Sequence, residues 1–157
     1  EIYGTRLFLP QMIERGEGYI VNVASLSGLV LLPLHICYTT TKYGITGFTE
    51  ALWAEARLHG IGVSLVCPGA VSTNIMEHTR GYSKTGRQRD SEERWEHILT
   101  QRGMDPEEAG RRVLEAVAKR KFLVLLRPEA YLLYYLKRLF PGLTLRINAA
   151  ISNYLSK

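Results

Sequence analysis

Three side chains in the first third of the chain have the types and spacing that proton transfer requires: Ser25, Tyr38 and Lys42. Tyr38 and Lys42 are four residues apart in a segment with helical periodicity, so their side chains lie on one face. An ammonium beside a phenol stabilises the phenolate, which suits Tyr38 to act as a general acid and base. The Tyr-x-x-x-Lys spacing alone is weak evidence, because an exposed helix contact has the same pattern.

The elements around these residues are expected to place them at one edge of a sheet. Residues 19–23 (YIVNV) form an apolar, β-branched run that is typical of a strand buried on both faces. Residues 38–59 carry apolar side chains at helical spacing, and residues 63–67 (VSLVC) form a second apolar run that a Pro-Gly pair ends. Two strands joined by such a helix should be parallel neighbours. Ser25 would then lie at the carboxyl edge, where α/β folds bind ligands.

Further elements flank this strand-helix-strand unit. Residues 3–15 have helical spacing of apolar side chains and end before a glycine. Asp105, followed by a proline, is expected to cap a helix that runs to about residue 120. Residues 122–126 form a third short apolar strand, and a helical tail broken once at Pro141 follows it. The order predicts an α/β fold.

Composition places the chain among ordinary folded proteins. Of the 157 residues, 46% are hydrophobic and 22% are charged, which excludes disordered, collagen-like and disulfide-scaffold classes and favours one domain over residues 1–157. No apolar stretch approaches the roughly 20 residues that a membrane-spanning helix needs.

The cysteines and histidines show no metal-binding pattern. Cys37 and Cys67 lack pairing or metal spacing and have apolar neighbours, so both are expected in the core, in a reducing, cytoplasmic setting. His35 and His78 lack a second ligand at metal spacing. No metal site is therefore expected.

Positive charge accumulates late in the chain. The net charge is +5, with −1 in residues 1–75 and +6 in residues 76–157. Basic and aromatic residues alternate towards the C-terminus, and two interpretations of residues 129–157 stay open. This tail either packs on its own sheet or on a neighbouring subunit, or it lies as an amphipathic element on an anionic membrane surface, which would make the protein peripherally membrane-associated. No nucleic-acid partner is assigned.

Three motifs, taken in order, resemble those of the short-chain dehydrogenase/reductase family. They are GYIVNVASLSG at residues 18–28, YTTTK at residues 38–42 and PGAVST at residues 68–73. The resemblance covers residues 3–76 strongly and the remainder loosely. It implies a Rossmann-like, doubly wound parallel sheet. It also implies hydride transfer between NAD or NADP and a carbonyl or alcohol group of a small-molecule substrate.

The resemblance also assigns roles to single residues. Tyr38 is the acid/base, Lys42 stabilises its phenolate and hydrogen-bonds the nicotinamide ribose, and Ser25 holds the substrate oxygen. His35, between Ser25 and Tyr38 in the sequence, is expected to line the substrate entrance. The loop after the second strand lies against the nicotinamide and contributes four residues, namely Pro68, Gly69, Val71 and Thr73.

Assembly and a lid are expected as well. By resemblance, the helices at residues 3–15 and 38–59 pack across a twofold axis, which gives a homodimer or homotetramer. Their apolar surface for core and contact would come from Phe48, Leu52 and Trp53. Residues 76–104 are polar and punctuated by glycine, with one helix expected around residues 92–99, and we interpret them as a substrate lid.

One family feature is missing from this chain. No G-x-G-x-x-G turn follows a strand, so the domain is expected to be incomplete and to lack the adenosine-binding half at its N-terminus. We therefore assign the activity to the complete protein. The alternative is a catalytically inactive fragment or an interaction module that docks through its basic aromatic tail, residues 129–157.

Overall fold

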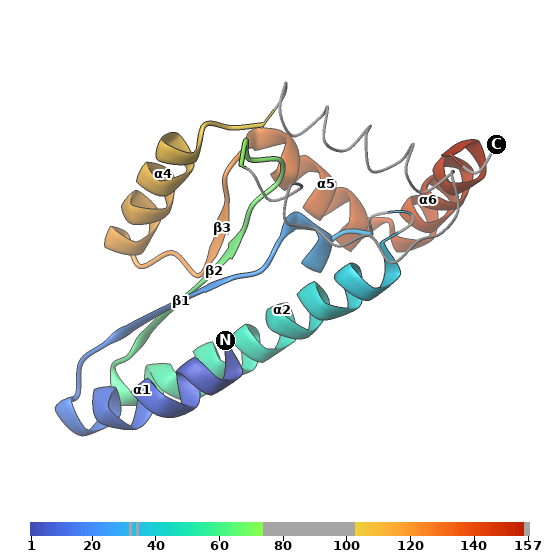
Figure 1. Cartoon of the computed structure of the whole chain (residues 1–157). Helices are drawn as coiled ribbons and strands as arrows, with labels where there is room; N and C mark the ends of the chain where they lie inside the picture. Colours follow the sequence, from blue (N-terminus) through green and yellow to red (C-terminus); the bar gives the residue numbers. More distant parts are fainter. Residues whose placement is uncertain (32, 34, 74–102, 156–157) are drawn as a thin grey trace.

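The computed structural model of the chain describes residues 1–31, 33, 35–73 and 103–155 (Figure 1). Its centre is a sheet of three parallel strands in the order β1-β2-β3. The strands are β1 (Tyr19–Val23), β2 (Gly62–Cys67) and β3 (Leu123–Leu125). Helices cover both faces of this sheet, which confirms the predicted doubly wound α/β arrangement.

One face of the sheet carries the two N-terminal helices, α1 (Ile2–Arg15) and α2 (Ile36–Ala56). They pack on β1 and β2 through a cluster that includes Leu52 and Ala56 of α2 and Val63 of β2. A short 3-10 turn, η2 (Arg57–His59), continues α2 and leads into β2. The predicted helix at residues 38–59 is therefore present and begins two residues earlier than expected.

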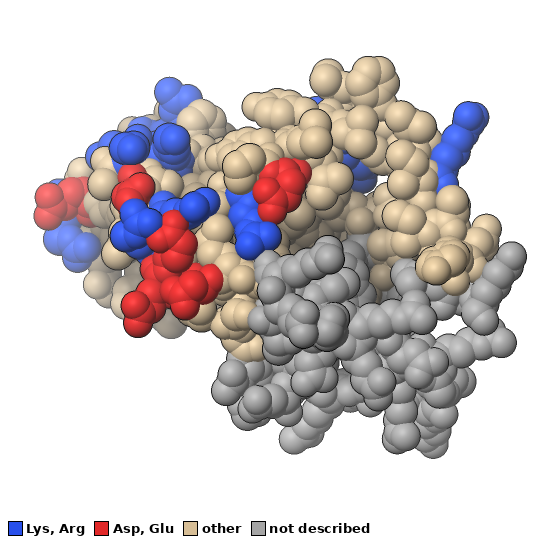
Figure 2. Space-filling view, turned by 90° about the horizontal axis from the view of Figure 1, so that it is seen from above, with Lys and Arg blue, Asp and Glu red and all other residues tan. Residues whose placement is uncertain are grey.

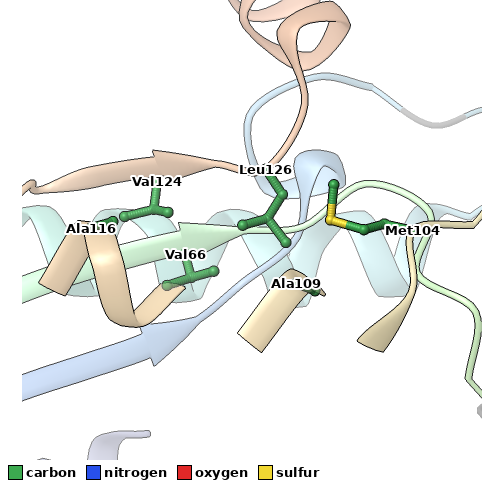
Figure 3. Close-up of a cluster of buried hydrophobic side chains, with 6 residues drawn as sticks. All are labelled: Val66, Met104, Ala109, Ala116, Val124 and Leu126. Carbon is green, nitrogen blue, oxygen red and sulfur yellow. The ribbon is translucent and has the colours of Figure 1, made fainter. Parts of the chain in front are cut away.

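The other face of the sheet carries α4 (Pro106–Ala118). Figure 3 shows the cluster beneath it, in which Ala109 and Ala116 of α4 meet Val66 of β2 and Val124 of β3. The predicted cap is confirmed, because the Asp105 side chain accepts hydrogen bonds from the backbone N–H groups of Glu107 and Glu108. The cap fixes where α4 begins and hence which side chains reach the sheet.

All six residues of β2 are buried, as its continuous apolar run predicts. The same prediction is wrong for β1, where Val21 is 38% and Val23 is 48% exposed. The α4 cluster includes the β2 residue Val66, which pairs with Val23, but no residue of β1. Because α4 covers only β2 and β3, the β1 side chains on that face lack a cover among the described residues.

The C-terminal part consists of two helices, α5 (Pro128–Leu139) and α6 (Pro141–Leu155). The break at Pro141 is as predicted, because proline ends α5 and is well suited to start α6. Ala130 and Tyr134 of α5 pack against the sheet beside Leu125. The predicted helix at residues 92–99 lies outside the described residues, and so does the predicted lid at residues 76–104 apart from its last two residues.

Candidate active site at the carboxyl edge of the sheet

Ser25 follows β1 at the carboxyl edge of the sheet, where the sequence analysis expects it. Pairing with β2 continues past the strand, since Ala24 N–H donates to the Val66 carbonyl and Leu26 N–H to the Pro68 carbonyl, both at 2.8 Å. Ser25 has an extended backbone, and its Oγ accepts a hydrogen bond from Ser27 N–H at 3.1 Å. Ser25 thereby caps the 3-10 turn η1 (Leu26–Gly28). The partly buried serine is held beside the Pro68-Gly69 loop.

Tyr38 and Lys42 lie in the first two turns of α2 and face each other. The Lys42 Nζ is 5.8 Å from the centre of the Tyr38 ring and donates a hydrogen bond of 3.4 Å to the Val23 carbonyl at the end of β1. Tyr38 is 41% exposed, whereas Lys42 is half-buried. The Lys42 ammonium is therefore tied to the end of β1 and lies near the accessible Tyr38 ring.

Gly28 explains how the Ser25 segment comes so close to α2. A Cβ atom at this position would lie 2.6 Å from the Lys42 carbonyl oxygen and 2.7 Å from Thr46 Oγ1. Any side chain here would push η1 away from the helix that carries Tyr38 and Lys42. Sequence analysis named Gly28 as part of a motif, and its close approach to the Lys42 backbone appears only in the structure.

The loop after β2 is held from two sides. Its Pro68 carbonyl receives the Leu26 hydrogen bond, and Val71 forms a parallel bridge with Met104. Ser72 N–H donates to the Met104 carbonyl, and Met104 N–H donates to the Ala70 carbonyl, both at 2.9 Å. Gly69 and Thr73 remain exposed along this loop. The four loop residues expected to face a cofactor are therefore on an anchored, accessible segment next to Ser25.

His35 is the residue before α2, three positions from Tyr38. Its Nδ1 lies 2.9 Å from the Pro33 carbonyl oxygen, and the residue is partly buried. The ring is thus oriented by the loop that joins η1 to α2. That His35 lines the substrate entrance stays a prediction.

The two cysteines differ, which corrects the expectation that both belong to the core. Cys67 at the end of β2 is fully buried, and burial raises the pKa of its thiol to about 12, despite opposing contributions from the Ser25 backbone and the Lys42 charge. Cys37, in the first turn of α2, is exposed. The neutral Cys67 thiol packs beneath Ser25.

Two polar residues near the site were missed by the sequence analysis. Asn22 of β1 is 4% exposed and donates a hydrogen bond of 3.0 Å to Thr49 Oγ1 on α2. The pair connects β1 to α2 about two helical turns beyond Lys42. The signal was an asparagine inside an otherwise apolar strand, which requires a buried partner. Among the described residues, no group of three His, Cys, Asp or Glu side chains is placed to hold a metal ion.

Comparison with known proteins shows similarity in fold. A solved short chain dehydrogenase/reductase from Burkholderia phymatum, in complex with NAD, matches with a TM-score of 0.81 and 27% identity over 90% of this chain and 54% of that one. A short chain dehydrogenase from Burkholderia cenocepacia, in complex with NADP, shares the fold with a TM-score of 0.66, 21% identity and coverage of 88% and 49%.

Curated relatives extend the match to the sequence level. Dehydrogenase/reductase SDR family member 7B from Bos taurus is 32% identical over 149 residues, which are 93% of this chain and 43% of the relative. The chain spans about half the length, or less, of the curated relatives it matches. The family model for short chain dehydrogenases matches residues 2–83, more than half of the chain. The chain therefore belongs to the short-chain dehydrogenase family of oxidoreductases.

Proposed function

We propose that the natural full-length protein uses NAD or NADP to interconvert a carbonyl and an alcohol group on a small molecule, with Tyr38 as the acid/base. The observation that carries the proposal is the accessible Tyr38 phenol with the Lys42 Nζ 5.8 Å from its ring centre, at the sheet edge where Ser25 lies. A phenol with an ammonium near its ring, at the same sheet edge as a second hydroxyl, suits the protonation and deprotonation of a substrate oxygen.

Each of the three residues has a distinct task in this proposal. In the reductive direction, the Tyr38 hydroxyl gives its proton to the substrate oxygen, and the Lys42 ammonium stabilises the phenolate that remains. Ser25 Oγ already accepts from Ser27 N–H, so its own hydrogen is available for the substrate oxygen. Both hydroxyl groups therefore bind an oxygen that gains negative charge in the transition state.

The residues present fit the nicotinamide end of a dinucleotide. Lys42 lies at the sheet edge, and the anchored loop leaves Gly69 and Thr73 exposed beside it. The cofactor would be held by Tyr38 and Lys42 together with Pro68, Gly69, Val71 and Thr73. When bound, it supplies or accepts the hydride. Support for this assignment comes from the relatives, of which one is solved with NAD and another with NADP.

Replacing the Tyr38 hydroxyl tests the proposal. Tyr38→Phe in the full-length protein should lower kcat by about 10² to 10⁴, since general acid-base catalysis contributes on this scale. Cofactor affinity, measured by fluorescence titration, should stay within about threefold, because the ring remains. Tyr3→Phe removes a hydroxyl from a residue that is 81% exposed on α1, and it serves as the matched control. An unchanged kcat in Tyr38→Phe would remove Tyr38 from the chemistry.

We also propose that the protein assembles through α1 and α2. Leu52 is 6% exposed and belongs to the core, but Trp53 is 36% exposed, and α1 presents Leu7 at 67% and Phe8 at 58% exposure. Exposed apolar side chains on both helices are typical of an interface between subunits. The expected assembly is a homodimer or homotetramer. A monomer in sedimentation velocity at micromolar concentration would contradict it.

A specific observation on α6 favours a second role, contact of the tail with an anionic membrane. The least exposed positions along this helix are polar, Thr144 above all, with Asn148 and Ser152 partly buried. Two of these residues bond within the helix, because Thr144 Oγ1 donates to the Pro141 carbonyl and Asn148 Nδ2 donates to the Thr144 carbonyl. The apolar side chains point outward instead, with exposures from 42% to 77% for Leu143, Ile147, Ile151 and Tyr154.

The charges on the tail fit an anionic partner. Arg138 and Arg146 accompany the outward apolar side chains, and the only acidic residue of α5 and α6, Glu129, pairs with Arg127 at 3.2 Å. Figure 2 shows, on the face that it draws, charged side chains gathered over α4, whereas the described residues towards the opposite end are mostly uncharged there. An amphipathic helix of this kind binds by apolar burial together with basic attraction. No described helix is long and apolar enough to cross a membrane.

Vesicle sedimentation tests the membrane role independently of catalysis. The full-length protein should bind phosphatidylserine-containing vesicles at low salt, and replacing Leu143, Ile147 and Ile151 with Ser should reduce binding about tenfold or more. Tyr38→Phe is the matched control and should bind as the wild type does. Equal binding by the triple variant, or absence of wild-type binding, would leave the tail as a segment that packs on protein.

A further inference from the structure

Tyr43, the residue after Lys42, joins three segments that are far apart in the sequence. Its hydroxyl donates a hydrogen bond of 2.9 Å to the Leu29 carbonyl, and Lys137 of α5 donates one of 2.9 Å to the same hydroxyl. The Lys137 Nζ also lies 5.4 Å from the centre of the Tyr43 ring. Leu29 is 14 residues before Tyr43, and Lys137 is 94 residues after it. Loop, helix and tail therefore meet at one phenol.

The contact with Leu29 bears directly on Ser25. Leu29 directly follows η1, and its N–H, like that of Val30, donates to the Leu26 carbonyl. The first attachment of η1 to α2 is the close packing of Gly28 on the Lys42 backbone. The Tyr43 hydroxyl adds a second attachment one residue further along. Two consecutive anchors on the same turn of α2 thus set the position of the segment that Ser25 caps.

Among the described residues, the Lys137 ammonium donates to the Tyr43 phenol and forms no ion pair with a carboxylate. Arg127 of the same region, in contrast, pairs with Glu129. A hydrogen bond from an ammonium polarises the phenol and strengthens the bond that the phenol donates onward. The Leu29 anchor is therefore stronger when α5 is docked on α2 than when Tyr43 acts alone.

We propose that Tyr43 is a positioning residue, held by Lys137 of α5, that aligns the Ser25 hydroxyl with the substrate oxygen. The inference rests on the proposed function, in which Ser25 binds that oxygen. It makes the position of Ser25 depend on the docking of the C-terminal tail, which the sequence places more than a hundred residues away. Tyr43 and Lys137 touch neither substrate nor cofactor in this scheme.

Kinetics of two variants test the proposal. Tyr43→Phe and Lys137→Met should each lower kcat about tenfold, because small misplacements of a catalytic hydroxyl are costly, while cofactor affinity stays unchanged. The double variant should be no worse than Tyr43→Phe alone, since the two act through one chain of contacts. Lys137→Arg, which keeps a charged donor, should recover most of the activity. Lys119→Met, directly after α4, removes an exposed charge of the same type and is the matched control.

A background without the Ser25 hydroxyl separates positioning from general stability. In Ser25→Ala, Tyr43→Phe should cause no further loss of kcat, whereas a merely structural effect would reduce kcat by the same factor in both backgrounds. Hydrogen exchange of the amides at residues 26–30 gives a readout without turnover, and exchange should rise at least severalfold in Tyr43→Phe and in Lys137→Met. Unchanged exchange, or an equal loss of kcat in both backgrounds, would overturn the proposal.

The outcome also distinguishes this proposal from the function on which it rests. If Tyr38→Phe keeps full activity, the assigned chemistry is wrong. If Tyr38→Phe is inactive but Tyr43→Phe behaves as the wild type in turnover and exchange, the chemistry stands and only the positioning role is lost.

Discussion

Strand β2 and helix α6 are both rich in aliphatic residues, yet their surroundings are opposite. Every residue of β2 is buried, including the polar Ser64, because α2 lies on one face of the strand and α4 on the other. Along the described part of α6 only Thr144 is buried, and leucine and isoleucine side chains point outward. Residue type alone therefore did not decide burial. What decided it was the number of faces that neighbouring elements cover.

The largest expected effect comes from shortening a side chain in β2. Leu65 is fully buried, so Leu65→Ala should lower the free energy of unfolding by about 2–5 kcal/mol through lost burial and a cavity. Leu143→Ala on α6 makes the same change at a position that is 50% exposed and should cost about 0.5 kcal/mol or less. Urea denaturation of the full-length protein measures both. Similar losses would contradict the contrast between the two regions.

A buried hydroxyl in β2 gives the next effect. Ser64 Oγ donates a hydrogen bond of 2.7 Å to the Lys121 carbonyl, so the Tyr19 hydroxyl, 2.8 Å away, must donate to Ser64. Ser64→Ala removes the partner of both the Lys121 carbonyl and the Tyr19 hydroxyl and should cost about 1–3 kcal/mol in denaturation.

Thr144→Ala on α6 is the comparison for Ser64, because that hydroxyl bonds only to carbonyls of its own turn. Its expected loss is smaller, about 0.5 kcal/mol, since the freed carbonyls stay near solvent at a helix start. A larger loss from Thr144→Ala than from Ser64→Ala would reverse the order of the two regions.

Alkaline pH should weaken the sheet region through Cys67. Its folded-state pKa of about 12 lies above the ordinary value of 9.0, so the folded chain keeps a proton that the unfolded chain releases. This contribution to stability is complete below about pH 9 and is lost as the pH rises towards 12, by about 1.4 kcal/mol per pH unit. Cys67→Val should remove this slope from denaturation curves measured between about pH 8 and 10.5.

Cys37 supplies the control for the pH experiment, since its thiol is already exposed in the folded chain. Cys37→Ser should leave the alkaline slope as it is in the wild type. A thiol reagent should label Cys37 in the native protein and reach Cys67 only after unfolding. Rapid labelling of both cysteines under native conditions would show that the end of β2 is open to solvent.

The smallest effect concerns the helix starts in the two regions. Asp105 caps α4 through two backbone hydrogen bonds, so Asp105→Ala should cost about 1 kcal/mol. Arg127 occupies the corresponding position of α5 and makes no side-chain cap bond. Arg127→Ala should therefore cost only about 0.3 kcal/mol. Thermal denaturation measures both. An equal decrease in Tm for the two variants would mean that the side-chain cap of α4 adds no stability beyond what the uncapped position of α5 has.

Much of the fold was predictable because local signals agreed with the tertiary arrangement. The proline and aspartate at the start of α4 and the proline between α5 and α6 place those boundaries without reference to the rest of the chain. The predictions that missed, the second buried face of β1 and the burial of Cys37, both concern what covers a side chain. A hydrophobic pattern indicates which environment a side chain favours. Only the tertiary packing decides whether other elements cover that side chain.

The candidate site divides in the same way. The sequence was enough to identify Ser25, Tyr38 and Lys42, because their residue types and spacing indicate their chemistry. Helical geometry brings Tyr38 and Lys42 together within two turns. Two contacts could not be predicted from the sequence, because each joins segments that no local pattern connects. They are the contact of Gly28 with the Lys42 backbone and the hydrogen bond from Lys137 to Tyr43.

The amino-acid sequence by itself determined the order of helices and strands, their boundaries at proline, glycine and aspartate, and the residues able to move a proton. These are properties of neighbours along the chain, which backbone sterics, capping and side-chain periodicity govern over a few residues. Only the tertiary structure decided which faces are covered, how closely η1 approaches α2 and where the tail attaches. Those outcomes depend on packing between distant segments, whose free energy is shared among many contacts that no local pattern contains.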